Sequence, residues 1–293
     1  MTRNTPGIAY NRKIIPYLFI LPNMVLFVAF MIVPIFMTGY YSLTKWNGIG
    51  AKEFIGLANY AKIFSNSTFL TSLKNTFVFS LAVVPLEMAL GLLTAMLLNQ
   101  PFRLRGFVRA SLYLPCMISS VITGLAFMWL FDTNLGLLNY LLSLAGIDKV
   151  PWAESRQYAM IMIIITYLWH YTGSKMVIYL AALQGIPAEY YEAATVDGAN
   201  GLQRFIHITI PMLSGTNIFV MITSIIESFK AFDLIHTMTG GGPRNATSTL
   251  VMYIYNTAFV NNNFGRASAA GIILFVFLFI FTLLRFRAER SKR

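Results

Sequence analysis

Residues 14–44 read IIPYLFILPNMVLFVAFMIVPIFMTGYYSLT, a run of 31 residues without lysine, arginine, aspartate or glutamate. A helix needs roughly 20 predominantly apolar residues to cross the hydrocarbon core of a bilayer. The run therefore predicts a membrane-spanning helix over about residues 14–41. It contains Pro16, Pro22 and Pro34 and lacks a small-residue cleavage site, which favours a retained helix over a signal peptide.

Five further apolar stretches follow along the chain. Those at residues 75–102 and 157–188 contain one charged residue each, Glu87 and Lys175, and those at 110–131, 205–226 and 267–284 contain none. Together the six stretches predict spans at about residues 14–41, 75–99, 108–131, 158–183, 207–228 and 267–284. We therefore expect an all-α membrane protein in which residues 14–293 form a single transmembrane domain, with no separate soluble domain.

The composition excludes two broad classes of protein. Charged residues make up 11% of the chain and hydrophobic residues 57%, and the mean hydropathy is +0.64. A typical soluble domain has roughly 25% charged residues, so a soluble enzyme and a disordered chain are both excluded. The net charge of +11 would suggest nucleic acid in a soluble protein. Here the basic residues form short clusters beside apolar runs, which is typical of membrane topology instead.

Two other uncharged stretches do not enter the count of spans. Residues 134–146 are apolar over only 13 residues, a length that suits an interfacial or re-entrant helix. Residues 245–265 contain many polar side chains, and their apolar centre, residues 250–255, is too short to span a bilayer. A seventh span would also move the basic C-terminus to the other face.

The distribution of lysine and arginine predicts the orientation. Basic residues are concentrated in short segments on one side of the six predicted spans, and that side is cytoplasmic by the positive-inside rule. These residues are Arg3, Arg12, Lys13, Arg103, Arg105, Arg109, Arg204, Arg285, Arg287, Arg290, Lys292 and Arg293. Both termini are therefore predicted to be cytoplasmic, with residues 1–13 forming a short N-terminal segment.

The loop between the fourth and fifth predicted spans, residues 186–211, reads IPAEYYEAATVDGANGLQRFIHITIP. We expect helices over residues 188–196 and 202–208, separated by a turn. Gly198 and Gly201 permit that turn. Three acidic residues, Glu189, Glu192 and Asp197, lie where the positive-inside rule would favour basic ones. They indicate either a docking surface for another protein or a solvated loop helix, and the residues alone leave both open.

Part of this loop resembles a known signature. Glu192-Ala193-Ala194, three residues, Gly198, nine residues and then Ile208-Thr209-Ile210-Pro211 resemble the EAA signature of permeases from binding-protein-dependent ABC importers. Ile210 stands where the family usually has leucine, a conservative change. The resemblance implies the type I ABC importer permease fold, with cytoplasmic coupling helices over residues 186–211 that sit in a groove of the ATPase. The residues implied in ATPase coupling are Glu189, Glu192, Ala193, Ala194, Asp197, Gly198, Arg204 and Pro211.

Other segments resemble the carbohydrate-uptake permeases of this family, of the maltose, glycerol-phosphate and multiple-sugar type. They include Phe232-Asp233-Leu234-Ile235, Met238-Thr239-Gly240-Gly241-Gly242-Pro243, Tyr253-Ile254-Tyr255 and Arg105-Gly106-Phe107. The resemblance covers nearly the whole chain. It implies a sugar or sugar-like solute delivered by an extracytoplasmic binding protein, which would contact Gly240, Gly241, Gly242 and Pro243.

The glycine run at residues 240–243 differs from a phosphate-binding loop. No Gly-Lys-Ser/Thr follows it, and no such lysine pattern occurs elsewhere in the chain. We expect a turn on the outer side of the membrane. The chain is accordingly expected to be a transport subunit rather than an enzyme, without a cofactor of its own, while partner ATPase subunits bind ATP and Mg²⁺.

Polar residues inside the predicted spans are candidates for the solute pathway. A charge at mid-bilayer costs roughly 2.5–3.5 kcal/mol on insertion scales, so Lys175, Glu87 and Glu227 should face a cavity, a partner helix or an interface. For Glu87, bonding between helices is favoured. Aromatic rings with hydroxyl groups suit sugars, and the resemblance places the substrate cavity on the fourth to sixth spans. The pathway candidates are Tyr171, Lys175, Tyr179, Asn217, Ser224, Glu227 and Phe229.

Packing or interface anchoring remains the alternative for each of these pathway residues. Lys230 and Asp233 are three residues apart near the outer membrane end. They are expected either to form a surface ion pair or to contact the binding protein.

The resemblance implies an importer in a prokaryotic cell membrane. Its expected partners are a second permease subunit of a different chain, two ABC ATPase subunits, the binding protein, the solute and membrane lipid, with no nucleic acid. The alternative function is an ion-coupled secondary transporter of a small polar solute, a class that usually shows internal repeats. No catalytic or metal site is expected, because His170, His207 and His236 lack metal-ligand spacing and Cys116 is the single cysteine.

Overall fold

The computed structural model describes residues 15–290. The predicted cytoplasmic segment 1–13, with Arg3, Arg12 and Lys13, lies outside the described residues, as do Lys292 and Arg293 at the other end. The chain forms two compact units, which are described separately. Unit 1 comprises residues up to 63 together with 257–275, and unit 2 comprises 64–256 together with the residues from 276 onward. The expectation of a single domain over residues 14–293 stays a prediction.

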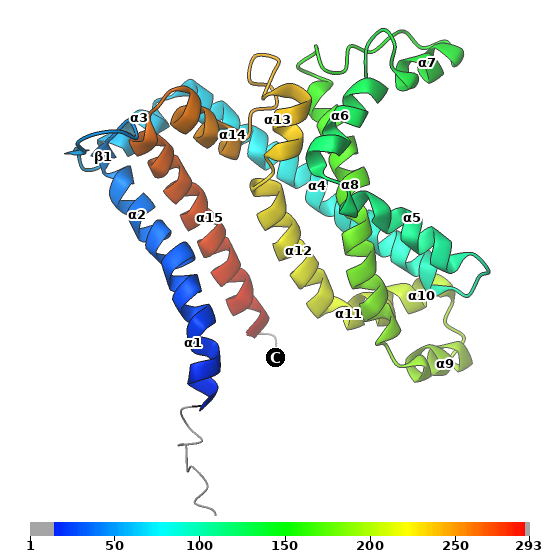
Figure 1. Cartoon of the computed structure of the whole chain (residues 1–293). Coiled ribbons are helices and arrows are strands. Elements are labelled where there is room, and N and C mark those ends of the chain that lie inside the picture. Colours follow the sequence, from blue (N-terminus) through cyan, green and yellow to red (C-terminus); the bar gives the residue numbers. More distant parts are fainter. Residues whose placement is uncertain (1–14, 291–293) are drawn as a thin grey trace, which may run out of the picture. The chain divides into compact units, whose positions relative to one another are not determined.

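Unit 1 begins with a long apolar helix in three parts. These are α1 (Ile15–Phe27), the π-helical turn η1 (Val28–Ile32) and α2 (Val33–Ser42) (Figure 1). Pro34 lies at the start of α2. Proline lacks an N–H and clashes with the carbonyl four residues earlier, and the wider π-turn at that point accommodates it. Almost all described side chains of this helix are exposed, as expected for a surface that faces lipid or another subunit.

The rest of unit 1 anchors the end of this helix. It contains the hairpin of β1 (Thr44–Lys45) and β2 (Glu53–Phe54), α3 (Ala58–Phe64), η3 (Asn256–Val260) and the start of α15 (Phe264–Arg290). The buried Asn59 amide donates to the carbonyl oxygens of Ser42 and Thr44, at 2.9 and 2.8 Å. The Trp46 carbonyl accepts from the Gly265 N–H at 3.1 Å. These bonds fix the hairpin between α2 and α15.

Unit 2 contains most of the helices. In chain order they are α4 (Ser67–Asn99), α5 (Arg105–Met117), α6 (Ser120–Leu130), α7 (Leu137–Leu144), α8 (Ala159–Gln184), α9 (Ala188–Val196), α10 (Gly201–Arg204), η2 (Phe205–Thr209), α11 (Ile210–Met212), α12 (Ser214–Phe229), α13 (Asp233–Thr239) and α14 (Leu250–Tyr255). The long helices α4 and α8 pack along each other and are flanked by α5 and α12 (Figure 1). Gly91 permits the close approach, because a Cβ there would lie 2.8 Å from Lys175 Cβ.

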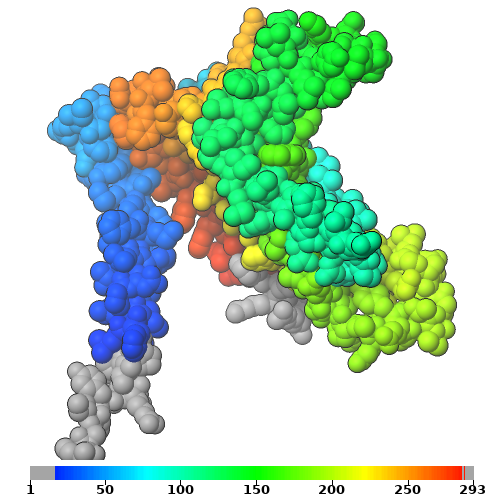
Figure 2. Space-filling view, turned by 45° about the vertical axis from the view of Figure 1, so that its right-hand side comes forward, coloured from blue at the N-terminus to red at the C-terminus, as the bar shows by residue number. Residues whose placement is uncertain are grey.

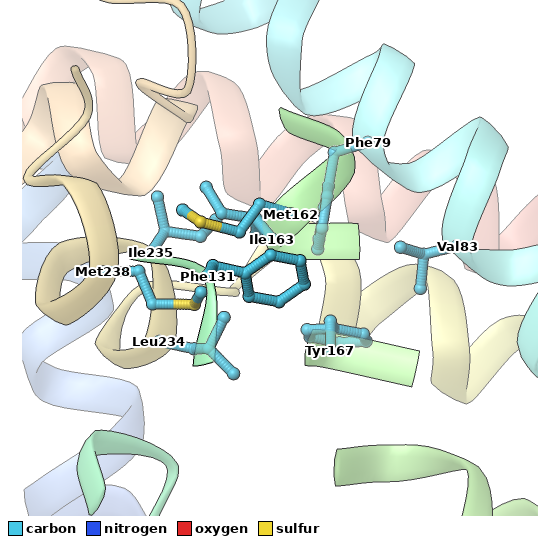
Figure 3. Close-up of a cluster of buried hydrophobic side chains, with 9 residues drawn as sticks. All are labelled: Phe79, Val83, Phe131, Met162, Ile163, Tyr167, Leu234, Ile235 and Met238. Atoms are coloured by element: carbon cyan, nitrogen blue, oxygen red, sulfur yellow. The ribbon is translucent and has the colours of Figure 1, made fainter. Parts of the chain in front are cut away.

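Two apolar clusters form the core of unit 2. One joins α4, α6, α8 and α13 through Phe79, Val83, Phe131, Met162, Ile163, Tyr167, Leu234, Ile235 and Met238 (Figure 3). The other joins α4, α8 and α12 through Ala95, Leu98, Met176, Tyr179, Leu180, Leu183, Leu213 and Val220. The buried Glu87 carboxylate lies on α4 between the two apolar clusters.

The structure bends two of the predicted spans. Ile118 and Ser119 are extended between α5 and α6, which meet at an angle of 101°. A second bend of 68° lies at Leu213, between α11 and α12. Pro115 and Pro211 lie within three residues before these bends, and proline removes one backbone donor from each helix.

Length and apolarity identify three described helices that could cross a membrane. They are Tyr17–Ser42, Ser67–Asn99 and Phe264–Arg285, and counting each bent pair as one span raises the number to five. Helix α8 has 26 residues but is not among them, because His170, Lys175 and several hydroxyl-bearing side chains lower its hydropathy. Since α8 covers the predicted fourth span, the count of six stays a prediction.

Candidate functional site

The predicted cytoplasmic loop forms a projection at one end of unit 2, visible in yellow-green in Figure 2. Helix α9 covers Ala188–Val196, as the sequence predicted, and α10 with η2 forms the second short helix. Glu189 lies in the first turn of α9, where the helix dipole favours a negative charge. The side chains of Glu189, Glu192 and Asp197 are exposed, and none forms an ion pair with a described residue.

Apolar side chains are exposed beside these acidic groups. Val196 is 88% exposed and Leu202 67% exposed. Of the other residues assigned to coupling, Ala193 is exposed, Ala194 is half-buried and Pro211 is exposed. A surface that combines unpaired carboxylates with exposed apolar groups is suited to contact another protein.

Hydrogen bonds between residues of the projecting loop stabilise its shape. The side chains and backbone of Asn200 and Gln203 form a reciprocal cap at the start of α10, and Gly198 supplies the positive φ of +78° needed in the turn before it. Arg204 Nη1 donates to the hydroxyl of Thr195 at 3.0 Å. This bond ties the end of α9 to α10, so Arg204 supports the shape of the loop from inside.

A cavity of about 380 Å³ lies behind the braced loop. It is lined by Met96, Asn99, Gln100, Leu183, Tyr191, Gly201, Arg204, Phe205 and Thr209. These residues come from the ends of α4 and α8 and from α9, α10 and η2. The cavity therefore separates part of the loop from the ends of the two long helices.

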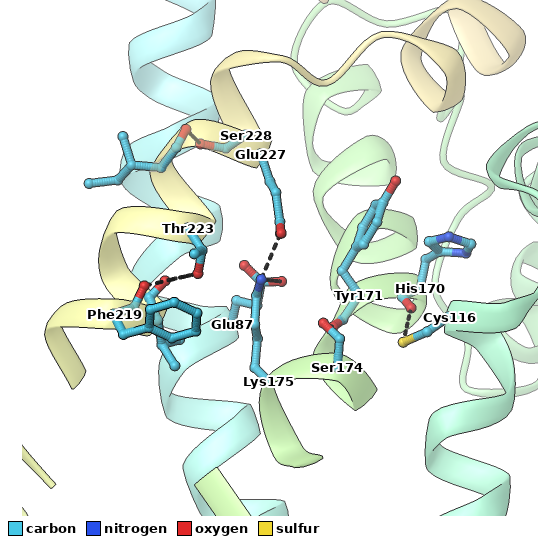
Figure 4. A network of polar contacts seen from close by, with 12 residues as sticks. Glu87, Cys116, His170, Tyr171, Ser174, Lys175, Phe219, Thr223, Glu227 and Ser228 are labelled. Carbon is cyan, nitrogen blue, oxygen red and sulfur yellow. Dashed lines mark hydrogen bonds and ion pairs between the residues drawn. The ribbon is translucent and has the colours of Figure 1, made fainter. Parts of the chain in front are cut away.

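A charged cluster lies among α4, α8 and α12, deep in unit 2 (Figure 4). Lys175 Nζ is 2.6 Å from Glu227 Oε2 and 3.8 Å from Glu87 Oε1. The side chains of Lys175 and Glu87 are 2% and 0% exposed, whereas that of Glu227 is 45% exposed. A buried charge is tolerated when it is paired, and Lys175 is paired on both sides. This ion pair links Glu87 on α4 to Lys175 on α8, as predicted for Glu87, while neither Glu87 oxygen makes a hydrogen bond with a described residue.

A small pocket opens beside Glu227. It has a volume of about 180 Å³ and is lined by Tyr167, Tyr171, Ile226, Glu227, Lys230, Ala231, Phe232, Asp233 and Leu234. The rings of Tyr167 and Tyr171 lie 4.3 Å apart between centroids. Aromatic faces, hydroxyls and carboxylates together can stack against the C–H face of a sugar ring and bond to its hydroxyl groups.

The structure brings together only some of the predicted pathway residues. Tyr171 and Glu227 line the pocket, and Lys175 is joined to it through Glu227. The Ser224 hydroxyl is buried and makes no hydrogen bond with a described residue. Asn217 is half-buried and lies on α12, ten residues before Glu227.

Tyr179 and Phe229 are placed in packing contacts. Tyr179 belongs to the apolar cluster of α4, α8 and α12. The ring of Phe229 is stacked on Phe277 at 4.9 Å and meets Phe77 edge-on at 5.3 Å. Both residues therefore take the alternative role, packing, that the sequence left open.

Seven of the nine lining residues were not among the predicted pathway residues, and three of these seven carry polar or charged groups: Tyr167, Lys230 and Asp233. Tyr167 lies one helical turn before Tyr171, so the four-residue spacing along α8 carried a signal for it. Lys230 and Asp233 were expected as an ion pair or a binding-protein contact. Among residues 15–290 the structure contains no ion pair between them, and both line the pocket instead.

The glycine-rich segment 240–243 forms a turn, as predicted. Gly240 and Gly241 have φ values of +58° and +90°. The hydroxyl of Thr247 bonds to that of Thr239 at 2.7 Å and donates to the Gly242 carbonyl at 2.7 Å. The segment follows α13, at the end of unit 2 opposite to α9 (Figure 1).

The same outer loop is attached to α4. The amide of Asn75 donates to the carbonyl oxygens of Asn245 and Ser248, at 2.8 and 3.0 Å. The hydroxyl of Ser72 also lies 2.9 Å from that of Ser248. These bonds hold the loop rigidly on the helix, while Arg244 at its tip is exposed.

Comparison with known proteins identifies relatives over the full length of the chain. The glycerol-3-phosphate transport permease UgpA of Agrobacterium fabrum is 34% identical over 283 residues, which cover 96% of each chain. The trehalose/maltose transport permease MalF of Thermococcus litoralis is 34% identical over 291 residues, covering 99% of this chain and 98% of the relative. The sulfoquinovosyl glycerol transport permease SmoG of Agrobacterium fabrum is 32% identical over 295 residues.

Solved structures agree on the fold. A chain of a bacterial ABC transporter that imports the acidic polysaccharide alginate superposes with a TM-score of 0.84 at 24% identity, covering 96% of both chains. A bacterial alginate ABC transporter in complex with a periplasmic protein bound to an alginate pentasaccharide gives a TM-score of 0.85 at 24% identity. The chain therefore has the type I ABC importer permease fold.

Residues 87–293 match the family described as the inner membrane component of binding-protein-dependent transport systems. That match covers more than half of the chain and includes both the charged cluster and the projecting loop. It gives no support to the alternative of an ion-coupled secondary transporter. The chain belongs to the family of binding-protein-dependent transport system inner membrane components, the permease subunits of ABC importers.

Proposed function

We propose that this permease subunit imports a sugar or sugar-like solute through the pocket beside Glu227. The observation that carries the proposal is the pocket itself, where two tyrosine rings and carboxylate groups meet on α8, α12 and the segment after α12. Such lining suits a molecule with many hydroxyl groups. The relatives named above belong to transport systems for solutes with hydroxyl groups, namely glycerol 3-phosphate, trehalose or maltose, and sulfoquinovosyl glycerol.

The projecting loop is proposed to dock on the ATPase. Helix α9 follows α8 after three residues, and α10, η2 and α11 lead directly into α12. The two helices that line the pocket are thus joined in sequence to the two halves of the loop. A displacement of the loop by the ATPase would reach both sides of the pocket. Partner ATPase subunits would bind ATP and Mg²⁺ and carry out hydrolysis.

The docking residues divide into two groups by their place in the loop. Those on its outer surface, which would contact the ATPase, are Glu189, Glu192, Ala193 and Asp197, together with the exposed Val196 and Leu202. Gly198 and Arg204 form and brace the turn, and Pro211 lies at the junction with α12.

At the opposite end of unit 2, the rigid turn at residues 240–243 is proposed to receive the extracytoplasmic binding protein. Its attachment to α4 through Asn75 supports this role, because a fixed loop loses little conformational freedom on docking. The loop with α9 would then be cytoplasmic, and both termini would lie on that side of a prokaryotic cell membrane.

ATP-driven uptake in proteoliposomes tests the proposal. The complete complex, with its binding protein outside and ATP at the ATPase side, should import solute. Tyr171→Ala should reduce uptake at least tenfold while leaving assembly with the ATPase intact. Tyr140→Ala is the matched control, because Tyr140 on α7 is 60% exposed and lies outside the pocket. Uptake that is unchanged by Tyr171→Ala contradicts the proposed path.

A further inference from the structure

The charges around the pocket carry information about the class of solute. We propose that the pathway is built for an uncharged polyhydroxylated solute and disfavours phosphorylated, sulfonated or carboxylated ones. The inference rests on the proposed function, because it assumes that solute passes the pocket beside Glu227. Transporters of this family differ in the charge of their solute, since the relatives named above include two for anionic solutes, glycerol 3-phosphate and sulfoquinovosyl glycerol, and one for the neutral sugars trehalose and maltose.

The buried lysine beside the pocket is already occupied. Lys175 is the buried cation nearest to the pocket, and its ammonium group lies 2.6 Å from one Glu227 oxygen. The fully buried Glu87 stands on its other side at 3.8 Å. Two carboxylates therefore share one ammonium group, and an arriving phosphate or carboxylate would have to displace one of them.

The pocket wall adds no net positive charge. Besides Glu227, its charged residues are Lys230 and Asp233, one of each sign. The pocket and the charged cluster together contain three carboxylates, those of Glu87, Glu227 and Asp233, and two ammonium groups, those of Lys175 and Lys230. Their net charge is −1 when all five are ionised and zero when one carboxylate is protonated. Neither state attracts an anion.

The same groups suit hydroxyl donors. A carboxylate oxygen is acceptor-only, and the half-exposed Glu227 side chain lines the pocket while one of its oxygens binds Lys175. The half-buried Tyr171 can stack against an apolar ring face, and the buried Tyr167 supports its ring from behind. A neutral sugar can satisfy these groups without breaking the ion pair.

The first measurement uses the unaltered importer. The binding protein that stimulates ATP hydrolysis by this complex is purified with its natural solute, which is released and identified by mass spectrometry. We expect a solute without phosphate, sulfonate or carboxylate groups. An anionic solute overturns the inference, and it leaves the proposed function standing if Tyr171→Ala still abolishes uptake of that solute.

The second measurement tests the assigned cause with inorganic phosphate as the probe. In the intact complex, Glu227→Gln should free Lys175 and increase phosphate binding at least fivefold, as followed by broadening of the ³¹P resonance. The triple variant Glu87→Gln/Lys175→Met/Glu227→Gln, which leaves no unpaired carboxylate in the cluster, should lose that gain. Glu154→Gln, at an exposed position outside the pocket, should match the unaltered complex. If Glu227→Gln binds no more phosphate than this control, Glu227 does not shield Lys175 and the inference fails.

Discussion

The hydroxyl of Tyr191 on α9 lies 2.9 Å from the hydroxyl of Thr209 at the end of η2. Tyr191 is half-buried and Thr209 is buried, so the bond is sheltered from solvent. It connects the first half of the projecting loop to the segment that leads into α12. A force applied to α9 can therefore reach α12 through this contact as well as through the turn at Gly198.

Tyr191→Phe should weaken the link between ATP hydrolysis and transport. A neutral hydrogen bond contributes about 1 kcal/mol, so its loss should lower the ratio of solute imported to ATP hydrolysed by up to about fivefold. The measurement is the simultaneous counting of both quantities in proteoliposomes. Tyr190→Phe is the matched control, because the neighbouring Tyr190 is 53% exposed. If both variants give the same ratio of imported solute to hydrolysed ATP, the Tyr191 hydroxyl does not transmit force from α9 to α12.

Glu192→Lys should separate the permease from its ATPase without unfolding it. Glu192 is exposed on α9 and has no ion pair with a described residue, so the substitution should change stability by no more than about 0.5 kcal/mol. Reversal of the charge within a docking surface opposes association. Copurification of the ATPase and thermal unfolding are measured on the same preparations. Glu154→Lys, also exposed, is the control; full ATPase recovery with Glu192→Lys would contradict the docking surface.

Lys175→Met should destabilise the permease strongly. Removing one partner of a buried ion pair costs about 3–5 kcal/mol, because the remaining charge is left unpaired. Here Glu87 would lose its only ion-pair partner among residues 15–290. Adding Glu87→Gln to the Lys175→Met variant should recover part of the loss, since the buried carboxylate is then neutral. Thermal unfolding of the four combinations measures the coupling, and purely additive effects would show that the two side chains do not interact.

The sequence predicted the parts of this protein that depend on local pattern. The helix at residues 188–196 begins and ends as predicted, and the turn at Gly240 forms because glycine accepts a positive φ. The sharp bend after Pro115 was missed. A proline can end a helix or only kink it, and the outcome depends on how the neighbouring helices pack against it.

For the pathway residues, too, the sequence predicted the residue types but not their partners. Lys175 and Glu227 were predicted as polar residues that need partners, yet their mutual ion pair depends on how α8 and α12 are rotated. Phe229 and Tyr171 are chemically similar candidates, but Phe229 packs on Phe277 while Tyr171 faces the pocket. Residue type alone does not say which face of a helix is turned toward the cavity.

The orientation of the chain can be tested by labelling single cysteines in intact cells. The two ends of unit 2 carry exposed positions that suit this purpose, Arg244 in the outer turn and Val196 in the projecting loop. A membrane-impermeant thiol reagent should label Arg244→Cys from outside and should label Val196→Cys only after the membrane is opened. Replacing Cys116 with serine removes the native thiol. External labelling at position 196 would reverse the proposed topology.

The complete importer should contain this chain once, beside one copy of a different permease chain and two ATPase subunits. The pocket beside Glu227 is small and is lined by one side of α8 and α12, so a closed path for a sugar needs a second wall. The apolar helix Tyr17–Ser42 and the exposed part of Glu227 also leave surfaces that this chain does not cover by itself. Mass measurement of the intact complex in detergent decides the composition. Two identical copies of this chain without another permease would contradict the expectation and show that the second wall is a repeat of the first.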